Sequence, residues 1–178
     1  MTNLLGSGRV KKDSLRLESC GTIDELITTI GLVRVLIKDQ EINNTLKTIQ
    51  QDLFIVGVDL MLQQSTRKLR NNKMLPSVHH EMVQQLEEKI DRYVKELKPI
   101  DGFIIPGKGL ASALLHFTRA VTRRAERRVV GLSRRTKINH HVIAYLNRLS
   151  SLIFVLARVA DQREGLQEDV WHRKRHLE

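Results

Sequence analysis

At 178 residues and 41% hydrophobic side chains, the chain is long enough for one domain with a sizeable core, and a second independent domain is not expected. Only 3 Pro and 10 Gly interrupt its long periodic segments, which favours an all-α fold over a sheet of many short strands. The net charge of +10 indicates an anionic partner, although this sign does not separate a small phosphorylated ligand from a nucleic acid.

A single cysteine, Cys20, excludes an internal disulfide framework and gives no metal-ligand spacing, which fits a reducing cytoplasm. The first residues lack the apolar segment of a signal peptide. The longest apolar run, residues 152–157, is too short to span a bilayer. We therefore expect a soluble cytoplasmic protein without a membrane partner.

Residues 1–20 contain Gly, Ser and Lys and predict an N-terminal arm or loop. Thr22 followed by Glu25 matches a capping box, so the first helix is expected to run from about residue 22 to residue 38. Asp24 would then lie near the positive end of that helix. Its carboxylate either stabilises this end or pairs with an arginine elsewhere in the chain, and Arg119 is the obvious candidate.

Apolar residues recur every three or four positions in two further segments, which predict helices over about 41–64 and 76–97. The polar stretch between them, residues 63–73, is expected to be a mobile basic loop. His79 and His80 share no helix face with other metal-ligating residues at a convincing spacing, so we expect them to be surface residues.

Residues 99–109 include two Pro and three Gly and cannot be helical, yet Phe103, Ile104 and Ile105 within them are strongly apolar. Such a loop either tucks under the core or lines a ligand pocket. The sequence leaves both alternatives open.

A fourth helix is expected over about 110–132, and it carries a row of arginines in which Arg119, Arg123 and Glu126 share one face. The row is explained equally well by a solvated face with ion pairs or by a face that binds phosphate groups. In the second case the ligand is a nucleotide or the backbone of a nucleic acid.

A fifth helix, over about 139–164, is apolar on nearly every face and is expected at the centre of the bundle. Asn147 lies within this apolar stretch, and a buried amide must find hydrogen-bond partners. It is either a polar core residue or a ligand contact facing the same site as the fourth helix. The basic tail, residues 165–178, is expected to be flexible.

Five segments together resemble the PduO-type ATP:cob(I)alamin adenosyltransferases. These segments are GRVKKD at 8–13, GTIDEL at 21–26, FIIPG at 103–107, RAVTRRAER at 119–127 and YLNRLS at 145–150. They follow the order of the family and cover nearly the whole chain.

The resemblance implies an up-down five-helix bundle that assembles as a homotrimer, with ATP and the corrinoid meeting at subunit interfaces. It implies transfer of the 5′-deoxyadenosyl group of ATP to reduced cobalamin, cob(I)alamin, with release of triphosphate. A reductase or an adenosylcobalamin-dependent acceptor enzyme is a further expected partner.

Carried over by position, the resemblance also implies roles for individual residues. ATP-binding roles fall on Thr2, Lys12, Arg123, Glu126 and Asn147. Among these, Glu126 is the expected contact to Mg²⁺. Asp24 and Arg119 would form an ion pair across the subunit interface that organises the site. Phe103 would close the lower face of the corrin and remove the axial ligand of cobalt.

Two departures from the family pattern bear on function. A Thr- and Gly-rich segment of the T-x-x-G-D-x-G kind, which wraps the nucleotide phosphates, usually comes just before the position of Thr2, and the sequence begins too late to contain it. A non-catalytic or weakly active trimer that binds cobalamin or nucleotide is therefore the alternative function. Lys108 also stands where a second glycine is common, which adds a charge near the corrin loop.

A helical nucleic-acid-binding protein is the third hypothesis, suggested by the net charge and the arginine row. Only 4% of the residues are aromatic, and neither a base-stacking platform nor helix-turn-helix spacing is recognisable. We therefore expect no nucleic-acid partner.

Overall fold

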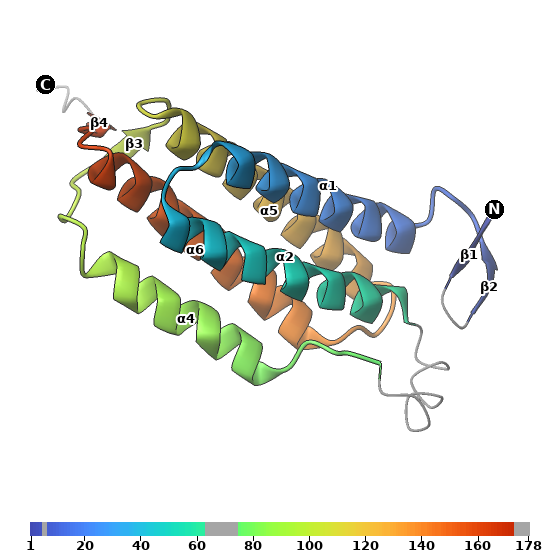
Figure 1. Cartoon of the computed structure of the whole chain (residues 1–178). Helices are drawn as coiled ribbons and strands as arrows, with labels where there is room; N and C mark the ends of the chain where they lie inside the picture. The colour runs from blue at the N-terminus through green and yellow to red at the C-terminus, as the bar shows by residue number, and fades with distance from the viewer. Residues whose placement is uncertain (5–6, 63–74, 173–178) are drawn as a thin grey trace, which may run out of the picture.

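The computed structural model describes residues 1–4, 7–62 and 75–172 of the chain. Within these residues five helices form a bundle in which each helix runs antiparallel to the one before it (Figure 1). The helices are α1 (Leu15–Leu36), α2 (Gln40–Met61), α4 (His80–Val94), α5 (Leu110–Ser133) and α6 (His140–Arg163). The expected all-α, up-down, five-helix bundle is confirmed.

Two short antiparallel strand pairs lie at opposite ends of the bundle (Figure 1). The strands are β1 (Thr2–Leu4) with β2 (Ser7–Val10), and β3 (Phe103–Ile105) with β4 (Asp169–Trp171). The expectation of a flexible tail is wrong for residues 169–171, because they form β4. Residues 173–178 of that tail lie outside the described residues.

The first helix begins seven residues earlier than the sequence predicts. Ser14 is its N-cap, and its Oγ accepts a hydrogen bond from the backbone N of Leu17 at 3.4 Å. Thr22 is therefore not a cap: it is buried within α1, and its hydroxyl donates to the carbonyl of Ser19 at 2.8 Å. The expected arm over residues 1–20 is correspondingly wrong for residues 15–20, which are helical.

The third predicted helix, α4, begins at His80 rather than at Pro76. Val78 N and Ser77 Oγ each donate to Oδ2 of the buried Asp59 at 3.0 Å, so these donors are held by α2. The segment before His80 is therefore extended, and the helix also ends at Val94, before the predicted residue 97. The predicted basic loop over residues 63–73 lies outside the described residues.

Helix α6 is central, as its sequence predicts, and it packs against α5, α4 and α2. In the described part of the chain it is the one helix long and apolar enough to cross a membrane, but 67% of its apolar window is buried inside the bundle. Core packing therefore accounts for its apolar character.

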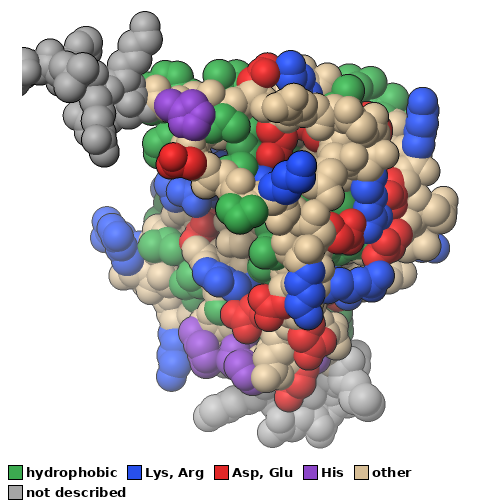
Figure 2. Space-filling model, turned by 90° about the vertical axis from the view of Figure 1, so that its left-hand side faces the viewer, with side chains coloured by type: hydrophobic (Ala, Val, Ile, Leu, Met, Phe, Trp, Pro, Cys, Tyr) green, Lys and Arg blue, Asp and Glu red, His purple; other side chains and the backbone are tan. Residues whose placement is uncertain are grey.

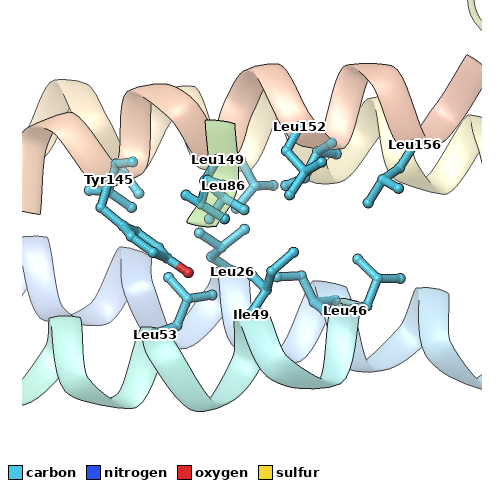
Figure 3. Packing of buried hydrophobic residues seen from close by; sticks show 14 of the residues in the cluster. Leu26, Leu46, Ile49, Leu53, Leu86, Tyr145, Leu149, Leu152 and Leu156 are labelled. Atoms are coloured by element: carbon cyan, nitrogen blue, oxygen red, sulfur yellow. The ribbon is translucent and has the colours of Figure 1, made fainter. Parts of the chain in front are cut away.

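The core is a layer of interdigitated aliphatic side chains from several helices (Figure 3). Tyr145 of α6 reaches across this layer, and its hydroxyl donates to Asp52 Oδ2 of α2 at 2.9 Å. Burial raises the pKa of both Tyr145 and Asp52. The buried Cys20 is a packed side chain, as expected, and burial raises the pKa of its thiol to about 11.

Candidate functional site

The arginine row of α5 divides between two faces of the helix. On the face toward α1, Arg124 pairs with Glu25, and Arg128 Nη2 lies 3.3 Å from Glu18 Oε1. All four of these side chains are about half exposed. A solvated face with ion pairs is therefore the correct description of these two arginines.

The face of α5 toward α6 forms a pocket of about 450 Å³. It is lined by Arg123, Glu126, Arg127, Val130, Gly131, Arg134 and Asn147. Arg123, Arg127 and Arg134 lie four and seven residues apart, which brings their guanidinium groups to one side of the helix. Three cations and one carboxylate therefore converge on this pocket, whose charge suits a polyanionic ligand.

Glu126 and Asn147 meet across the two helices of this pocket. Asn147 Nδ2 donates to Glu126 Oε1 at 3.0 Å, and Asn147 Oδ1 accepts from Arg148 Nη2 at 2.7 Å. Both ends of the amide are therefore bonded. Asn147 therefore faces the same pocket as the arginines of α5.

Arg119 lies about one helical turn before Arg123 and is not among the residues that line the pocket. Its guanidinium carbon lies 5.3 Å from the centroid of the Phe154 ring, and His116 meets the same ring edge-on at 5.9 Å. Burial, and then the charge of Arg123, lower the pKa of Arg119. Burial, and then the charge of Arg119, lower the pKa of His116. A partly desolvated cation therefore lies one helical turn from Arg123 of the pocket, on an aromatic support.

Three other predicted site residues lie apart from this pocket. Asp24 is exposed on α1 and forms no ion pair with Arg119 within the described chain. Lys12 is exposed between β2 and α1, and Thr2 lies in β1 with its backbone opposite Val10. Figure 1 shows the β1–β2 hairpin beyond the end of the bundle at which α1 begins.

Phe103 lies at the other end of the bundle, in β3, with 73% of its surface exposed. Tucking under the core is therefore the wrong alternative for this side chain. At about 1.5 Å per residue, about 24 Å of helix separates Leu110, at the start of α5, from Glu126. Within one chain, Phe103 and the α5–α6 pocket are thus far apart.

The sequence as a whole identifies the family of proteins that shares this arrangement. The family model described as Cobalamin adenosyltransferase matches residues 1–160. The chain belongs to the cobalamin adenosyltransferase family. The resemblance drawn from its motifs is thereby confirmed, and the chain is a corrinoid adenosyltransferase by family.

Similar proteins come from bacteria and from mammals. A corrinoid adenosyltransferase of Bacillus subtilis is 41% identical over 176 residues, covering 97% of this chain and 87% of its own length. One from Citrobacter freundii is 36% identical and covers 90% of this chain and 89% of its own length. The human corrinoid adenosyltransferase MMAB is 39% identical over 92% of this chain and 66% of its own length.

Solved structures of the family have the same fold. A phenylalanine-to-alanine variant of the PduO-type ATP:corrinoid adenosyltransferase from Lactobacillus reuteri, complexed with cobalamin and ATP, superposes with a TM-score of 0.90 at 32% identity. That match covers 97% of this chain and 94% of the other. An arginine-to-lysine variant complexed with ATP gives a TM-score of 0.87 at 32% identity, covering 96% of this chain and 94% of the other.

Several residues in and beside the pocket are not singled out by the sequence pattern. Arg127 and Arg134 share the face of Arg123, a signal that the four- and seven-residue spacings carry. Phe154 follows Asn147 by two helical turns, just as Glu126 follows Arg119, so these four side chains align along the two antiparallel helices. That alignment depends on the register between α5 and α6, which no local pattern contains.

Proposed function

We propose that the α5–α6 pocket binds the triphosphate of ATP and that the chain transfers the 5′-deoxyadenosyl group to cob(I)alamin. The observation that carries this proposal is the convergence of Arg123, Arg127 and Arg134 around Glu126 and Asn147. Arginine forks bind phosphate oxygens bidentately, and a charged triphosphate needs several such donors. ATP and cobalamin in complexes of the Lactobacillus reuteri relative support the choice of substrates.

The transfer is a nucleophilic displacement at the 5′ carbon of ATP. The electron pair of cobalt(I) forms the cobalt–carbon bond, while the C5′–O bond breaks and the triphosphate leaves with the electrons of that bond. The protein must hold the 5′ carbon in line with cobalt and neutralise the leaving group, which is a task for fixed cations. Acid–base chemistry is not needed, in keeping with a pocket lined by arginines.

Glu126 is the residue that we propose to contact Mg²⁺. It is the one carboxylate that lines the pocket, and its Oε1 is oriented by Asn147. Mg²⁺ in nucleotide sites is held by one or two carboxylates together with substrate phosphates, so one glutamate beside three arginines fits this ion. Bound there, the ion would add charge neutralisation at the phosphates.

Thr2 and Lys12 are proposed to reach ATP from the N-terminal hairpin, which lies at the end of the bundle where α5 terminates (Figure 1). Lys12 is exposed and free to point away from the bundle. In a homotrimer, these residues and the pocket would meet ATP together, because the hairpin extends past the bundle of its own chain.

Asp24 and Arg119 are proposed to pair between subunits. Asp24 is exposed on α1, and Arg119 is a partly desolvated cation fixed over Phe154. A carboxylate from a neighbouring chain would offset the desolvation of this guanidinium. The pair would then couple trimer assembly to the organisation of the site.

Phe103 is proposed to cover the lower face of the corrin, where it would displace the axial ligand of cobalt. Its exposed ring is available for such a contact. An apolar group at that position excludes water and offers no lone pair to the metal, which favours loss of the ligand.

We further propose that residues 1–178 act as one domain in the cytoplasm, where reducing conditions suit a single cysteine and a cobalt(I) substrate. A reductase must supply the reduced corrinoid, and an adenosylcobalamin-dependent enzyme must accept the product. Both are proposed partners of the homotrimer.

The test is an anaerobic assay in which the protein, chemically reduced cobalamin and Mg-ATP are mixed, and the absorbance change of cobalt–carbon bond formation is followed. Arg123→Ala and Glu126→Ala are each expected to lower the rate by about 100-fold or more, the usual cost of removing a charge-stabilising group. Arg128→Ala is the matched control, since Arg128 lies on the α1 face of the same helix, and its rate should stay within about twofold of wild type.

If either folded pocket variant turned over at the wild-type rate, the α5–α6 pocket would not be the ATP site. Cobalamin binding without product formation by the wild-type protein would instead support the alternative, a trimer that binds cobalamin or nucleotide without efficient catalysis.

A further inference from the structure

Two pairs of adjacent histidines lie at the starts of two neighbouring helices. His79 is the N-cap of α4 and His80 is its first residue, while His140 and His141 are the first two residues of α6. The ring centroids of His80 and His141 lie 6.0 Å apart, and those of His140 and His141 lie 3.9 Å apart. We call these four residues the histidine cluster. Figure 2 shows histidine side chains gathered near the lower edge of the molecule.

Asp59 of α2 holds the two residues that precede these pairs. Its Oδ2 accepts from Val78 N at 3.0 Å and from Asn139 Nδ2 at 2.7 Å. Asn139 Nδ2 also donates to the carbonyl of Val78 at 2.7 Å. Val78 directly precedes His79, and Asn139 directly precedes His140. The two helix starts are therefore bonded to each other and to α2, and this arrangement fixes the distance between the histidine pairs.

The position of the cluster disfavours protonated imidazoles. The first turn of a helix carries a partial positive charge from its unpaired backbone N–H groups, so a cation there is destabilising. His141 is half-buried, while the other three histidines are exposed. Partial burial lowers the pKa of His141, and the charges of His140 and His80 lower it further. Each protonated ring therefore makes protonation of the next less favourable.

Two carboxylates near the cluster act against this repulsion. Glu81 Oε2 lies 2.9 Å from His79 Nδ1, and the charge of Glu81 acts to raise the pKa of His141. Burial raises the pKa of Asp52 of α2, and the charge of His79 acts against that rise. Among the described residues, no charged group of α5 is among those that shift the pKa of His141. Two carboxylates thus face four imidazoles, and full protonation leaves an excess of positive charge.

Helix α4 is the element on which this charge acts most directly. Its chief packing partner is α6, so its position depends on the contact that the cluster spans. Its N-cap, His79, makes no side-chain hydrogen bond to the first turn. An N-cap without such a bond leaves the first turn less stable than a Ser, Thr or Asp cap does. Repulsion in the cluster therefore acts on an end of α4 that has no side-chain cap.

We propose that the histidine cluster is a pH-sensitive switch that keeps the start of α4 on the start of α6 only while its imidazoles are neutral. An unperturbed imidazole takes up a proton as the pH falls through about 6.5, and like charges then repel across the two helix starts. The pKa of His141 is lowered in the folded chain, so the unfolded chain takes up its proton first as the pH falls. The contribution of the cluster to stability is therefore full at higher pH and is lost as the pH falls through the imidazole range.

The experiment is hydrogen–deuterium exchange of the full-length protein at about pH 7.5 and about pH 5.5, on either side of the imidazole range and at one ionic strength. Protection factors, which correct for the intrinsic effect of pH on exchange, are compared for the amides of the first two turns of α4. The test variant combines His80→Asn with His141→Asn. His172→Asn is the matched control, because His172 is an exposed histidine that follows β4 at the opposite end of the bundle (Figure 1).

In the wild-type protein, acidification should lower these protection factors by about 5- to 10-fold, because several unfavourable charges at helix starts add together. The double variant should change by less than about twofold, since asparagine does not titrate and is a good residue at helix starts. His172→Asn should respond to pH as the wild type does. His80→Lys carries a permanent charge in the cluster, and it should lower protection by about 2- to 5-fold even at the higher pH.

Equal protection of the wild-type protein at both pH values would overturn the inference. An acid-induced loss of the same size in the double variant would also overturn it, because the loss would then arise from other groups, such as Asp52. Both results are read from exchange alone, so they are independent of whether the chain transfers the adenosyl group.

Discussion

At the scale of single residues, the chemistry of the site depends on which arginines have partners. Arg124 and Arg128 are paired with glutamates of α1, so their charge is offset on the outer face. Arg123 and Arg127 face the pocket, where Glu126 is the one lining carboxylate and already accepts a bond from Asn147. The same helix therefore separates structural cations from cations available to a ligand.

The support of Arg119 by Phe154 gives a test at this scale. Phe154→Leu keeps an apolar side chain on α6 but removes the ring face under the guanidinium and the edge contact to His116. A cation–π contact contributes roughly 0.5–2 kcal/mol, which corresponds to a fall in kcat of about 2- to 30-fold. Steady-state kinetics of adenosylcobalamin formation measure the effect.

Phe54→Leu is the control for that substitution, because Phe54 is 63% exposed on α2. Its kcat should match wild type. An unchanged kcat and ATP KM in Phe154→Leu would show that Arg119 keeps its working position without the ring.

The sequence predicts individual residues of the pocket better than their partners. Arg123, Glu126 and Asn147 are found because a charged row on one helix and an amide on an apolar helix are visible in one dimension. Phe154 is hidden among the many apolar residues of α6, and its role arises only from the register of α6 on α5. The register of α6 on α5 is therefore the feature that the sequence pattern does not predict.

At the scale of elements, Asp59 of α2 organises the starts of two other helices. Besides its bonds from Ser77 and Val78, its Oδ2 accepts from Asn139 Nδ2 at 2.7 Å. Asn139 is the N-cap of α6, and its Oδ1 accepts from His141 N at 3.1 Å. One buried carboxylate thus joins the end of α2 to the approach to α4 and to the first turn of α6.

Removing this carboxylate should destabilise the bundle substantially. Asp59→Ala removes the acceptor of one buried donor, Val78 N, and of two part-buried ones, and each hydrogen bond to a charged group contributes roughly 1.5–3 kcal/mol. We expect a loss of about 3 kcal/mol in the free energy of unfolding, measured by urea denaturation at fixed protein concentration. Ser77→Ala, which removes a single donor, should cost about 1 kcal/mol. A loss below about 1 kcal/mol in Asp59→Ala would contradict this role.

Helix boundaries show why local signals fall short at this scale. The capping box at Thr22 is a valid local pattern, but apolar positions continue before it, and Cys20 is buried in the core, so the helix extends back to Ser14. Pro76 likewise resembles a helix start, yet Asp59 holds the residues that follow it in an extended path. The strand at residues 169–171 is too short for a periodic signal, and its partner is β3, far away in the sequence.

At the scale of the whole molecule, the two halves of the proposed site, the α5–α6 pocket and Phe103, lie far apart within one chain. Glu126 of the α5–α6 pocket lies about 24 Å along α5 from Leu110, and Phe103 lies beyond the start of that helix. In the proposed reaction, cobalt would contact the 5′ carbon of ATP on one side while Phe103 covered its other side, so the two halves would have to lie closer together than this. In the proposed homotrimer, a head-to-tail arrangement would bring the pocket of one chain to the Phe103 loop of the next.

Mixing two inactive variants tests this arrangement. Glu126→Ala removes the pocket half and Phe103→Ala removes the corrin half, and co-expression in equal amounts allows mixed trimers to form. If neighbouring chains supply the two halves, each site has one chance in two of an intact pocket and one in two of an intact Phe103, so about a quarter of wild-type activity should return. A mixture of Arg123→Ala with Glu126→Ala, both in the pocket half, is the control and should stay inactive. If the first mixture were no more active than this control, both halves of the site would lie in one chain. In that case every chain would carry one defective half, and mixing the two variants could not produce an intact site.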